Sequence, residues 1–367
     1  MREAAAAFVR DVVRPAVASW DEAGSYPREA IAGSGLTGLF CPPEHGGAGL
    51  GYPAGMEVFE ELGRGDAALA FSLSMHNAVA AVVAGCDDEA LRERWARELV
   101  AGRALGGFSL TEPHAGSDAT AITTRAREDG GGWRVTGRKA WVSLAGEADL
   151  FLVVCKTADE PGHGDIAVVA IDGRADGVSF PRRYRTAAAP FLPIGEMALA
   201  DVQATMLVPP GAGMRAALGA IDVARCDIAA IACGLHAEAL DIALRYTRER
   251  QAFGAPLLAL DTMRFALADV LTDLEASRLL YARAAELLET PAGPTAVAHA
   301  KRFCPDAALR AAIACSEALG AYGWLDDTPL PRFISLAKML QVVDGTAEIQ
   351  RLVIGRELER MAARAEG

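Results

Sequence analysis

Hydrophobic residues along the chain change their spacing twice, which divides it into three regions. Apolar residues recur at helical spacing in four early segments, residues 2–20, 54–62, 67–83 and 89–99. Strand-forming residues bounded by turn residues then predict strands at 132–136, 150–155, 166–171 and 195–199. Helical spacing returns at residue 213 and is broken near 254–256, 291–294 and 320–331. The pattern predicts an N-terminal α-helical domain (1–105), a middle β domain (106–210) and a C-terminal α-helical bundle (211–367).

Composition allows a large core and argues against nucleic acid as a partner. With 367 residues, of which 51% are hydrophobic, the chain is long enough for two or three packed subdomains. A net charge of −12 disfavours nucleic acid, because nucleic-acid-binding domains usually present a basic patch. The seven cysteines are scattered without a close CxxC pair. They predict reduced, mostly buried thiols rather than a disulfide framework or a metal site.

Neither secretion nor membrane insertion is indicated by the sequence. Residues 1–4 lack the basic region and the uninterrupted apolar run of a secretory signal. No stretch long enough to cross a bilayer is expected to be free of charges or helix breakers. We therefore expect a cytoplasmic protein without a membrane partner.

Five short segments carry the residues that suggest chemistry. They read FSLTEPHAGSD (108–118), GRKAWVSLAG (137–146), IDVAR (221–225), YTRERQAFG (246–254) and VVDGTAEIQR (342–351). Together they resemble motifs of the acyl-CoA dehydrogenase family over nearly the whole chain. The acyl-CoA dehydrogenase fold has an N-terminal α-helical domain, a middle β-barrel-like domain and a C-terminal four-helix bundle, which is the order predicted here.

The resemblance implies flavin adenine dinucleotide (FAD) as the cofactor. In the family, a hydroxyl such as that of Thr111 bonds the polar edge of the flavin and an aromatic such as Trp141 forms a wall beside it. Arg250 would pair with the pyrophosphate of the neighbouring subunit's FAD. The residues expected to contact FAD are Phe108, Leu110, Thr111, Gly116, Ser117, Trp141, Ser143, Arg250, Phe253, Glu317, Gly320, Thr346 and Glu348.

Each of these segments also has an ordinary structural interpretation. Residues 108–118 would be a strand followed by a turn, and Trp141 would be a core residue. Arg250 would belong to a solvated basic helix end that is capped by Gly254. The presence of all the segments in the order of the family favours the flavin interpretation.

Asp344 is the predicted catalytic base. The family normally has a glutamate at this position, so the carboxylate is kept on a side chain that is one methylene shorter. Isovaleryl-type dehydrogenases place their base just before the arginine that matches Arg225, where this chain has Ala224. By the same resemblance, the residues expected to contact the thioester substrate are Ser117, Asp222, Arg225 and Gly345.

The resemblance also implies the reaction. The base removes the proton next to the thioester carbonyl while hydride leaves the β-carbon for the flavin. The backbone N–H of the base residue and a ribityl hydroxyl of the flavin stabilise the enolate oxygen. A buried carboxylate in this role is expected to have a raised pKa.

The aspartate bears on the substrate. A misplacement of roughly 1 Å can cost on the order of 10²-fold in rate, so Asp344 predicts a repositioned or different substrate. Nitroalkane oxidases, which share this fold, use an aspartate at the matching position. The alternative interpretation is that Asp344 only caps a helix that begins near Thr346.

The specific prediction is oxidation of a small hydroxylated acyl group held on an acyl carrier protein. The chain is similar to dehydrogenases that form the methoxymalonyl extender unit in polyketide antibiotic biosynthesis, and its high Ala, Arg and Gly content is typical of a GC-rich genome. The basic run at 182–185 would meet an acidic carrier protein, or would be a solvated strand end. Three alternatives remain: an ordinary short-chain acyl-CoA dehydrogenase, a nitroalkane-oxidase-like flavoenzyme, and a catalytically silent flavin-binding partner protein.

The resemblance further implies an oligomer and an electron acceptor. We expect a homodimer or homotetramer, because flavin sites of the family span dimer interfaces. An electron-transfer flavoprotein is the expected acceptor, with oxygen as the alternative.

Overall fold

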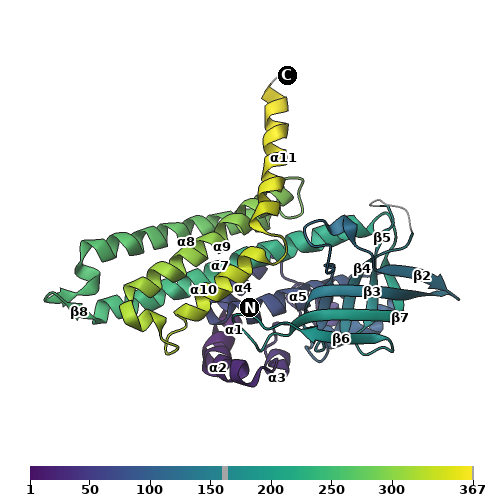
Figure 1. Cartoon of the computed structure of the whole chain (residues 1–367), viewed down its shortest axis with the longest axis horizontal. Coiled ribbons are helices and arrows are strands. Elements are labelled where there is room, and N and C mark those ends of the chain that lie inside the picture. Colours follow the sequence, from purple (N-terminus) through teal and green to yellow (C-terminus); the bar gives the residue numbers. More distant parts are fainter. Residues whose placement is uncertain (159–163, 366–367) are drawn as a thin grey trace. The chain divides into compact units, whose positions relative to one another are not determined.

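The chain folds into two units, one made mainly of helices and the other of strands and helices (Figure 1). The structure is a computed structural model that describes residues 1–158 and 164–365. Unit 1 consists of Met1–Pro15, Tyr52–Phe71 and Asp222–Gly367, and unit 2 of Ala16–Gly51 and Ser72–Ile221. The N-terminal region is therefore shared, because part of it packs with the C-terminal helices and part with the β strands.

Unit 1 is built on long helices that lie alongside one another (Figure 1). They are α4 (Tyr52–Gly65), α7 (Gly213–Glu249, from residue 222 onward), α8 (Asp261–Leu287), α9 (Gly293–Ala318) and α10 (Leu330–Val342). The last helix, α11 (Ala347–Ala365), projects away from the four helices α7 to α10. Shorter elements are α1 (Arg2–Phe8), a π-helical turn (Val9–Val13), the β8–β9 hairpin (Gln251–Ala252 and Ala255–Pro256) and 3-10 turns at Leu257–Ala259 and Gly320–Trp324.

Two glycines allow α4 and α7 to cross closely. A Cβ atom on Gly234 of α7 would lie 2.0 Å from the carbonyl oxygen of Glu60 on α4. A Cβ atom on Gly63 of α4 would lie 2.3 Å from the carbonyl oxygen of Ile231 on α7. Since real side chains do not approach backbone this closely, glycine at both positions sets the separation of the two helices.

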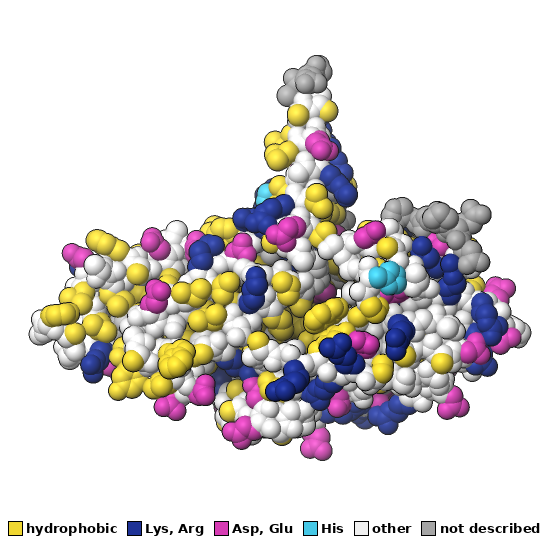
Figure 2. All heavy atoms as spheres, viewed as in Figure 1, with side chains coloured by type: hydrophobic (Ala, Val, Ile, Leu, Met, Phe, Trp, Pro, Cys, Tyr) yellow, Lys and Arg dark blue, Asp and Glu magenta, His cyan; other side chains and the backbone are white. Residues whose placement is uncertain are grey.

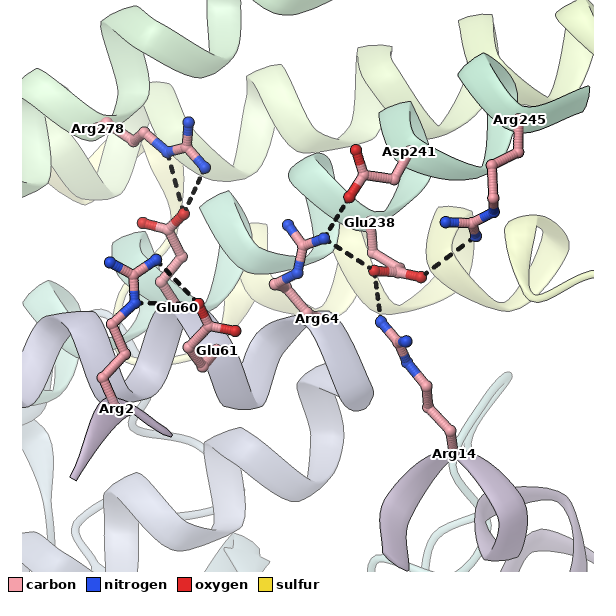
Figure 3. A network of polar contacts seen from close by, with 9 residues as sticks. All are labelled: Arg2, Arg14, Glu60, Glu61, Arg64, Glu238, Asp241, Arg245 and Arg278. Atoms are coloured by element: carbon pink, nitrogen blue, oxygen red, sulfur yellow. Dashed lines mark hydrogen bonds and ion pairs between the residues drawn. The ribbon is translucent and has the colours of Figure 1, made fainter. Parts of the chain in front are cut away.

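An ion-pair network surrounds this crossing (Figure 3). Arg278 of α8 donates to Glu60 Oε1 from Nε at 3.0 Å and from Nη2 at 2.8 Å. Glu238 of α7 lies 2.6 Å from Arg14, 3.3 Å from Arg64 and 3.7 Å from Arg245. Both carboxylates are buried, so their charges are compensated by several arginines from neighbouring helices.

Unit 2 contains a closed ring of strands. The strands are β1 (Gly106–Ser109), β2 (Arg125–Asp129), β3 (Gly132–Ser143), β4 (Leu150–Lys156), β5 (Ile166–Asp172), β6 (Val178–Arg183) and β7 (Ile194–Val208). The ring closes because β4 pairs with β2 on one side and with β5 on the other, while β3 and β7 complete the circuit. The predicted β-barrel-like middle domain is confirmed.

Helices of unit 2 supply the rest of its core. They are α2 (Arg14–Ala23), α3 (Arg28–Ala32), a 3-10 turn (Pro43–His45), α5 (Ala67–Ala84, from residue 72 onward) and α6 (Glu89–Val100). One hydrophobic cluster joins Val79 and Val83 of α5, Leu91 and Leu99 of α6, and Leu152 and Val154 of β4. Residues 213–221 of α7 also belong to this unit.

Most predicted elements are present, with longer bounds. The predicted helices at 2–20, 54–62, 67–83 and 89–99 each lie within observed helical segments, and the four predicted strands lie within β3, β4, β5 and β7. The strands β2 and β6 were not predicted, since both are polar and mostly exposed and lack an alternating apolar face. Helix α3, five residues long, was also missed.

One sequence expectation about membranes is wrong. Helix α5 has 18 residues with a mean hydropathy of 1.6, which is long and apolar enough to cross a bilayer by length and composition. However, 83% of this helix is buried inside the protein, as is typical of a core helix. The predicted burial of the thiols is confirmed for six of the seven cysteines, and Cys86 is partly exposed.

Candidate active site

The segment that contains Asp344 is a tight turn between α10 and α11. Helix α10 ends at Val342, and Asp344 and Gly345 follow with φ angles of +52° and +102°. Positive φ is strained for a residue with a Cβ atom and ordinary for glycine. The Asp-Gly pair therefore turns the chain between the two helices, and it holds the carboxylate in a conformation that the surrounding structure must stabilise.

Arg225 of α7 stabilises this turn from the side. Its Nε donates a 2.8 Å hydrogen bond to the carbonyl oxygen of Asp344, and its Nη1 donates a 2.8 Å hydrogen bond to Asp222. Gln350 of α11 donates to the carbonyl oxygen of Gly345 at 3.1 Å. A Cβ atom on Gly345 would lie 2.9 Å from Arg225 Nη2, so a side chain there would displace this guanidinium in addition to straining the backbone.

One carboxylate oxygen of Asp344 has no hydrogen-bond partner among the residues that the structure describes. Its Oδ2 atom is shielded from solvent and accepts no hydrogen bond from the residues that the structure describes. Burial raises the pKa of Asp344, while the positive charges of Lys301 and Arg225 oppose this rise. Burial likewise raises the pKa of Asp222, against the effect of Arg225. An unpartnered carboxylate with a raised pKa is the state expected of a general base.

The structure brings together one group of the predicted residues. Hydrogen bonds from Arg225 join Asp222 and Asp344 within unit 1, Gly345 lies beside the same guanidinium, and Thr346 and Glu348 follow directly in sequence. Ala224 is buried and carries no carboxylate, as the sequence indicated. Lys301, which affects the pKa of Asp344, was not predicted, because 43 residues of sequence separate it from the aspartate.

A second group lies on the barrel of unit 2. The N–H of Ala140 donates to the carbonyl oxygen of Thr111 at 2.9 Å, and Lys139 Nζ donates to the carbonyl oxygen of Leu110, also at 2.9 Å. Lys139 also pairs with Glu112 at 2.8 Å, and both side chains are almost fully buried. These bonds place segments 108–112 and 137–143 side by side, although neither Glu112 nor Lys139 was predicted as a site residue.

Trp141, which belongs to this group, has an exposed side chain. Its side chain is 64% exposed, its φ is +57°, and the register of β3 against β7 shifts between Lys139 and Val142. The ring of Tyr184, another unpredicted residue, packs against the indole with centroids 4.5 Å apart. A large aromatic held in a strained conformation at the surface is suited to cover a planar ligand.

The remaining barrel residues are consistent with a flavin beside Trp141. Gly116 and Ser117 are exposed, and no described atom of the chain lies within 4 Å of where a Cβ atom of Gly116 would be. The glycine is thus not required by the packing of the chain and leaves space for a ligand. Phe108 and Leu110 are partly buried against the core cluster, and Ser143 is buried. The residues present therefore fit FAD.

A third group lies at the other end of the helices of unit 1. Arg250 follows α7 directly, 25 residues beyond Arg225, which at 1.5 Å per residue is about 37 Å along the helix. Phe253 in the β8–β9 hairpin is 94% exposed. Glu317 and Gly320 at the end of α9 belong to the same region, since Tyr246 and Tyr322 pack with ring centroids 6.0 Å apart. One chain therefore does not bring these four residues to Asp344.

Comparisons with known proteins agree with this architecture along the whole chain. The N-terminal, middle and C-terminal domains of acyl-CoA dehydrogenases match residues 1–103, 107–202 and 211–359. The chain belongs to the acyl-CoA dehydrogenase family. As a member of this family it is an FAD-dependent oxidoreductase of acyl thioesters.

Individual relatives cover nearly all of the chain. An acyl-CoA dehydrogenase of Bacillus subtilis is 31% identical over 98% of this chain and 97% of its own length. The mitochondrial short-chain specific acyl-CoA dehydrogenase of Rattus norvegicus is 30% identical over 98% of this chain and 89% of its own length. Butyryl-CoA dehydrogenase from Megasphaera elsdenii is similar in structure, with a TM-score of 0.92 and 30% identity over 97% of this chain and 96% of that one.

Proposed function

We propose that the chain is an acyl-thioester dehydrogenase that uses Asp344 as its catalytic base. The observation that carries the proposal is the carboxylate of Asp344: its Oδ2 atom is shielded and has no hydrogen-bond partner among the described residues, its pKa is raised, and its backbone is held by Arg225. If Asp344 served only as a helix cap, its carboxylate oxygens would be expected to accept hydrogen bonds from the first N–H groups of the helix.

The chemistry assigns one proton to Asp344. For a saturated acyl group, the α-C–H bond breaks and its proton passes to the carboxylate, while the β-C–H bond breaks as hydride and a C=C bond forms. For an alcohol, the carboxylate takes the hydroxyl proton, hydride leaves the carbon that bears the hydroxyl, and a C=O bond forms. Bound FAD would supply the acceptor for the hydride in either case. Arg225 keeps the carboxylate in place by holding the backbone rather than the reacting oxygens.

For the substrate, we propose a small hydroxylated acyl group on an acyl carrier protein, as in formation of the methoxymalonyl extender unit. The shorter base supports a non-standard acyl group, since an aspartate does not reach as far as a glutamate. Arg182, Arg183 and Arg185 are exposed and offer positive charge to an acidic carrier. Part of that charge is used within the chain, because Arg182 lies 3.7 Å from Glu196.

A short-chain acyl-CoA is the second candidate substrate. The relatives that support it are named as a short-chain specific acyl-CoA dehydrogenase and a butyryl-CoA dehydrogenase. A small acyl group is common to both candidates, so they differ mainly in the carrier and in the hydroxyl.

We also propose that the chain works as an oligomer, with an electron-transfer flavoprotein or oxygen accepting its electrons. Hydrophobic side chains are exposed on the helices of unit 1 and along α11 (Figure 2). They include Phe253, Phe265, Leu279, Trp324, Leu352, Leu358 and Met361. Exposed apolar side chains in such number favour contact with another protein surface, and a second copy would bring Arg250 and Phe253 towards another flavin.

Anaerobic bleaching of the bound flavin tests the function. The FAD-loaded protein is mixed with butyryl-CoA, and with butyryl and hydroxylated three-carbon groups on CoA and on a carrier protein. Asp344→Asn should abolish bleaching, whereas Asp269→Asn, which removes an exposed carboxylate on α8, should not. Bleaching that survives in Asp344→Asn would remove Asp344 as the base. Equal bleaching rates with simple acyl-CoAs and with the carrier-protein substrates would contradict the proposal of a carrier-protein substrate.

Two other outcomes would redirect the assignment. Oxygen uptake and nitrite release with nitroethane would indicate a nitroalkane-oxidase-like activity. Flavin binding without bleaching by any thioester would indicate a catalytically silent partner protein.

A further inference from the structure

Lys301 is a buried cation close to the end of α10. It lies on α9 with 2% of its surface exposed, and its Nζ donates a 2.7 Å hydrogen bond to the carbonyl oxygen of Leu340. Lysine is rare in this chain, with four lysines among 36 lysines and arginines. An ammonium is more compact than a guanidinium, and it suits a site that has space for a single donor.

The hydrogen bond from Lys301 takes the place of a backbone hydrogen bond that the end of α10 does not make. In a continuing α-helix, the carbonyl of Leu340 would accept from the N–H of Asp344, four residues later. Val343, which follows α10, is extended with a ψ of 150°, so the helix ends there and that carbonyl is one of the last-turn groups without an intrahelical partner. Lys301 satisfies it with a charged donor at the negative end of the helix dipole.

The titratable and charged groups that influence Lys301 electrostatically come from three elements. They are Asp344 in the turn after α10, Arg225 on α7, and Asp306 together with the thiol of Cys304 on α9 itself. Burial lowers the pKa of Lys301 to about 8, and Asp344 acts in the opposite direction. Lys301 is therefore mainly protonated at neutral pH. Its positive charge, like that of Arg225, lowers the pKa of Asp344.

We propose that Lys301 is a positioning residue for the base, whose buried ammonium fixes the end of α10 and keeps the Asp344 carboxylate ionised within a site that disfavours charge. This inference rests on the proposed role of Asp344. It adds a second function to the lysine, because a helix cap alone needs a hydrogen-bond donor but no charge.

Two substitutions distinguish the role of Lys301 as a hydrogen-bond donor to the end of α10 from the role of its charge. Lys301→Gln keeps an N–H donor that can reach towards Leu340 and removes the charge, whereas Lys301→Met removes both. In both variants, the ascending limb of the pH profile of flavin bleaching should move to higher pH by on the order of one unit, since an opposite charge nearby stabilises an ionised carboxylate. Lys338→Gln, which removes an exposed lysine on α10, should leave the profile unchanged.

A second measurement needs neither flavin nor substrate. The unfolding temperature at pH 7 is compared in Asp344→Asn, Lys301→Gln and the double variant, which gives the coupling of the two side chains. Asp344→Asn should raise the unfolding temperature more when Lys301 is glutamine, because the carboxylate is then buried without this counter-charge.

The outcomes that overturn the inference are distinct from failure of the proposed function. A wild-type pH profile in Lys301→Gln, together with additive unfolding temperatures, would reduce Lys301 to a neutral cap. If Lys301→Gln does not fold, the double variant should recover the fold, and a double variant that also fails to fold overturns the charge role. Bleaching that persists in Asp344→Asn would instead reject Asp344 as the base.

Discussion

Arg225 binds the backbone of Asp344 and not its carboxylate. The 2.8 Å bond from Nε ends on the carbonyl oxygen, and the other contact of the guanidinium is with Asp222. If Arg225 instead formed an ion pair with the carboxylate, it would occupy the oxygens and lower the pKa of Asp344 further, which would make the group a weaker base. The arrangement fixes where the carboxylate lies while its oxygens remain available.

Arg225→Met should therefore impair the base without removing it. We expect the rate of flavin bleaching to fall by on the order of 10²-fold, because the turn loses its anchor and the carboxylate moves by a fraction of an ångström or more. Stopped-flow spectroscopy measures the rate. Arg283→Met removes an exposed arginine of α8 and serves as a control of equal charge. A wild-type rate in Arg225→Met would contradict an anchoring role.

Gly345→Ala should destabilise the turn between α10 and α11. At a φ of +102° an alanine is strained, and its Cβ atom would lie 2.9 Å from Arg225 Nη2. We expect a loss of about 1–3 kcal/mol in the free energy of unfolding, measured by urea titration. Gly355→Ala on α11 is the matched control, because its Cβ would meet nothing within 4 Å. It should stabilise the helix by roughly 0.5–1 kcal/mol, so equal effects of both variants would argue against strain at Gly345.

Glu112→Gln should change the acid stability of the protein. Burial would by itself raise the pKa of Glu112, but Lys139 and the hydrogen bonds from Thr123 and Thr124 lower it to about 2. A carboxyl group whose pKa is lower in the folded state stabilises the fold at pH values above its unfolded pKa, which is about 4.3 for glutamate. That stabilisation is lost as the pH falls to about 2.

The variant should lose about 3–5 kcal/mol at neutral pH, because it leaves the buried Lys139 without a counter-charge. Its stability should also depend less on pH between about 4.3 and 2 than that of the wild type. Denaturant titrations at several pH values measure both effects. Glu98→Gln removes an exposed carboxylate that pairs with Arg103 and should have little effect.

Gly234→Ala should separate α4 from α7. The new Cβ atom would lie 2.0 Å from the carbonyl oxygen of Glu60, and neither backbone can move without disturbing the ion pairs of Glu60 and Glu238. We expect a loss of at least about 1–3 kcal/mol, as for other overpacked sites, seen as a lower unfolding temperature. Gly219→Ala on the same helix meets nothing within 4 Å and should not lower it. An unchanged unfolding temperature in Gly234→Ala would show that the crossing tolerates a side chain.

Local features explain how much of the fold could be predicted. Helices α5, α6 and α7 have long apolar patterns and are flanked by turn residues such as glycine, aspartate and proline, so their positions follow from local sequence alone. Strands β2 and β6 have polar sequences and owe their conformation to pairing with β3 and β7. Closure of the barrel depends on pairs between distant strands, and no local pattern encodes them.

The candidate site divides in the same way. Asp344, Gly345, Trp141 and Arg225 belong to short segments whose residue order is informative by itself. Tyr184, Lys301 and the pair of Glu112 with Lys139 were missed as site residues because their importance lies in contacts made across the fold. The sequence expectation that no segment could cross a membrane failed for α5, since composition does not distinguish a core helix from a membrane helix.

The sequence by itself, through its resemblance to the family, determined which residues carry the chemistry: an aspartate in the position of the base, hydroxyls and an aromatic for a flavin, and an alanine at the alternative position of the base. Only the tertiary structure decided the state of that aspartate. Arg225 lies 119 residues before it and Lys301 lies 43 residues before it, on separate helices. The pKa of a carboxylate depends on burial and on the charges within a few ångströms of it, and these become defined when α7, α9 and α10 pack together.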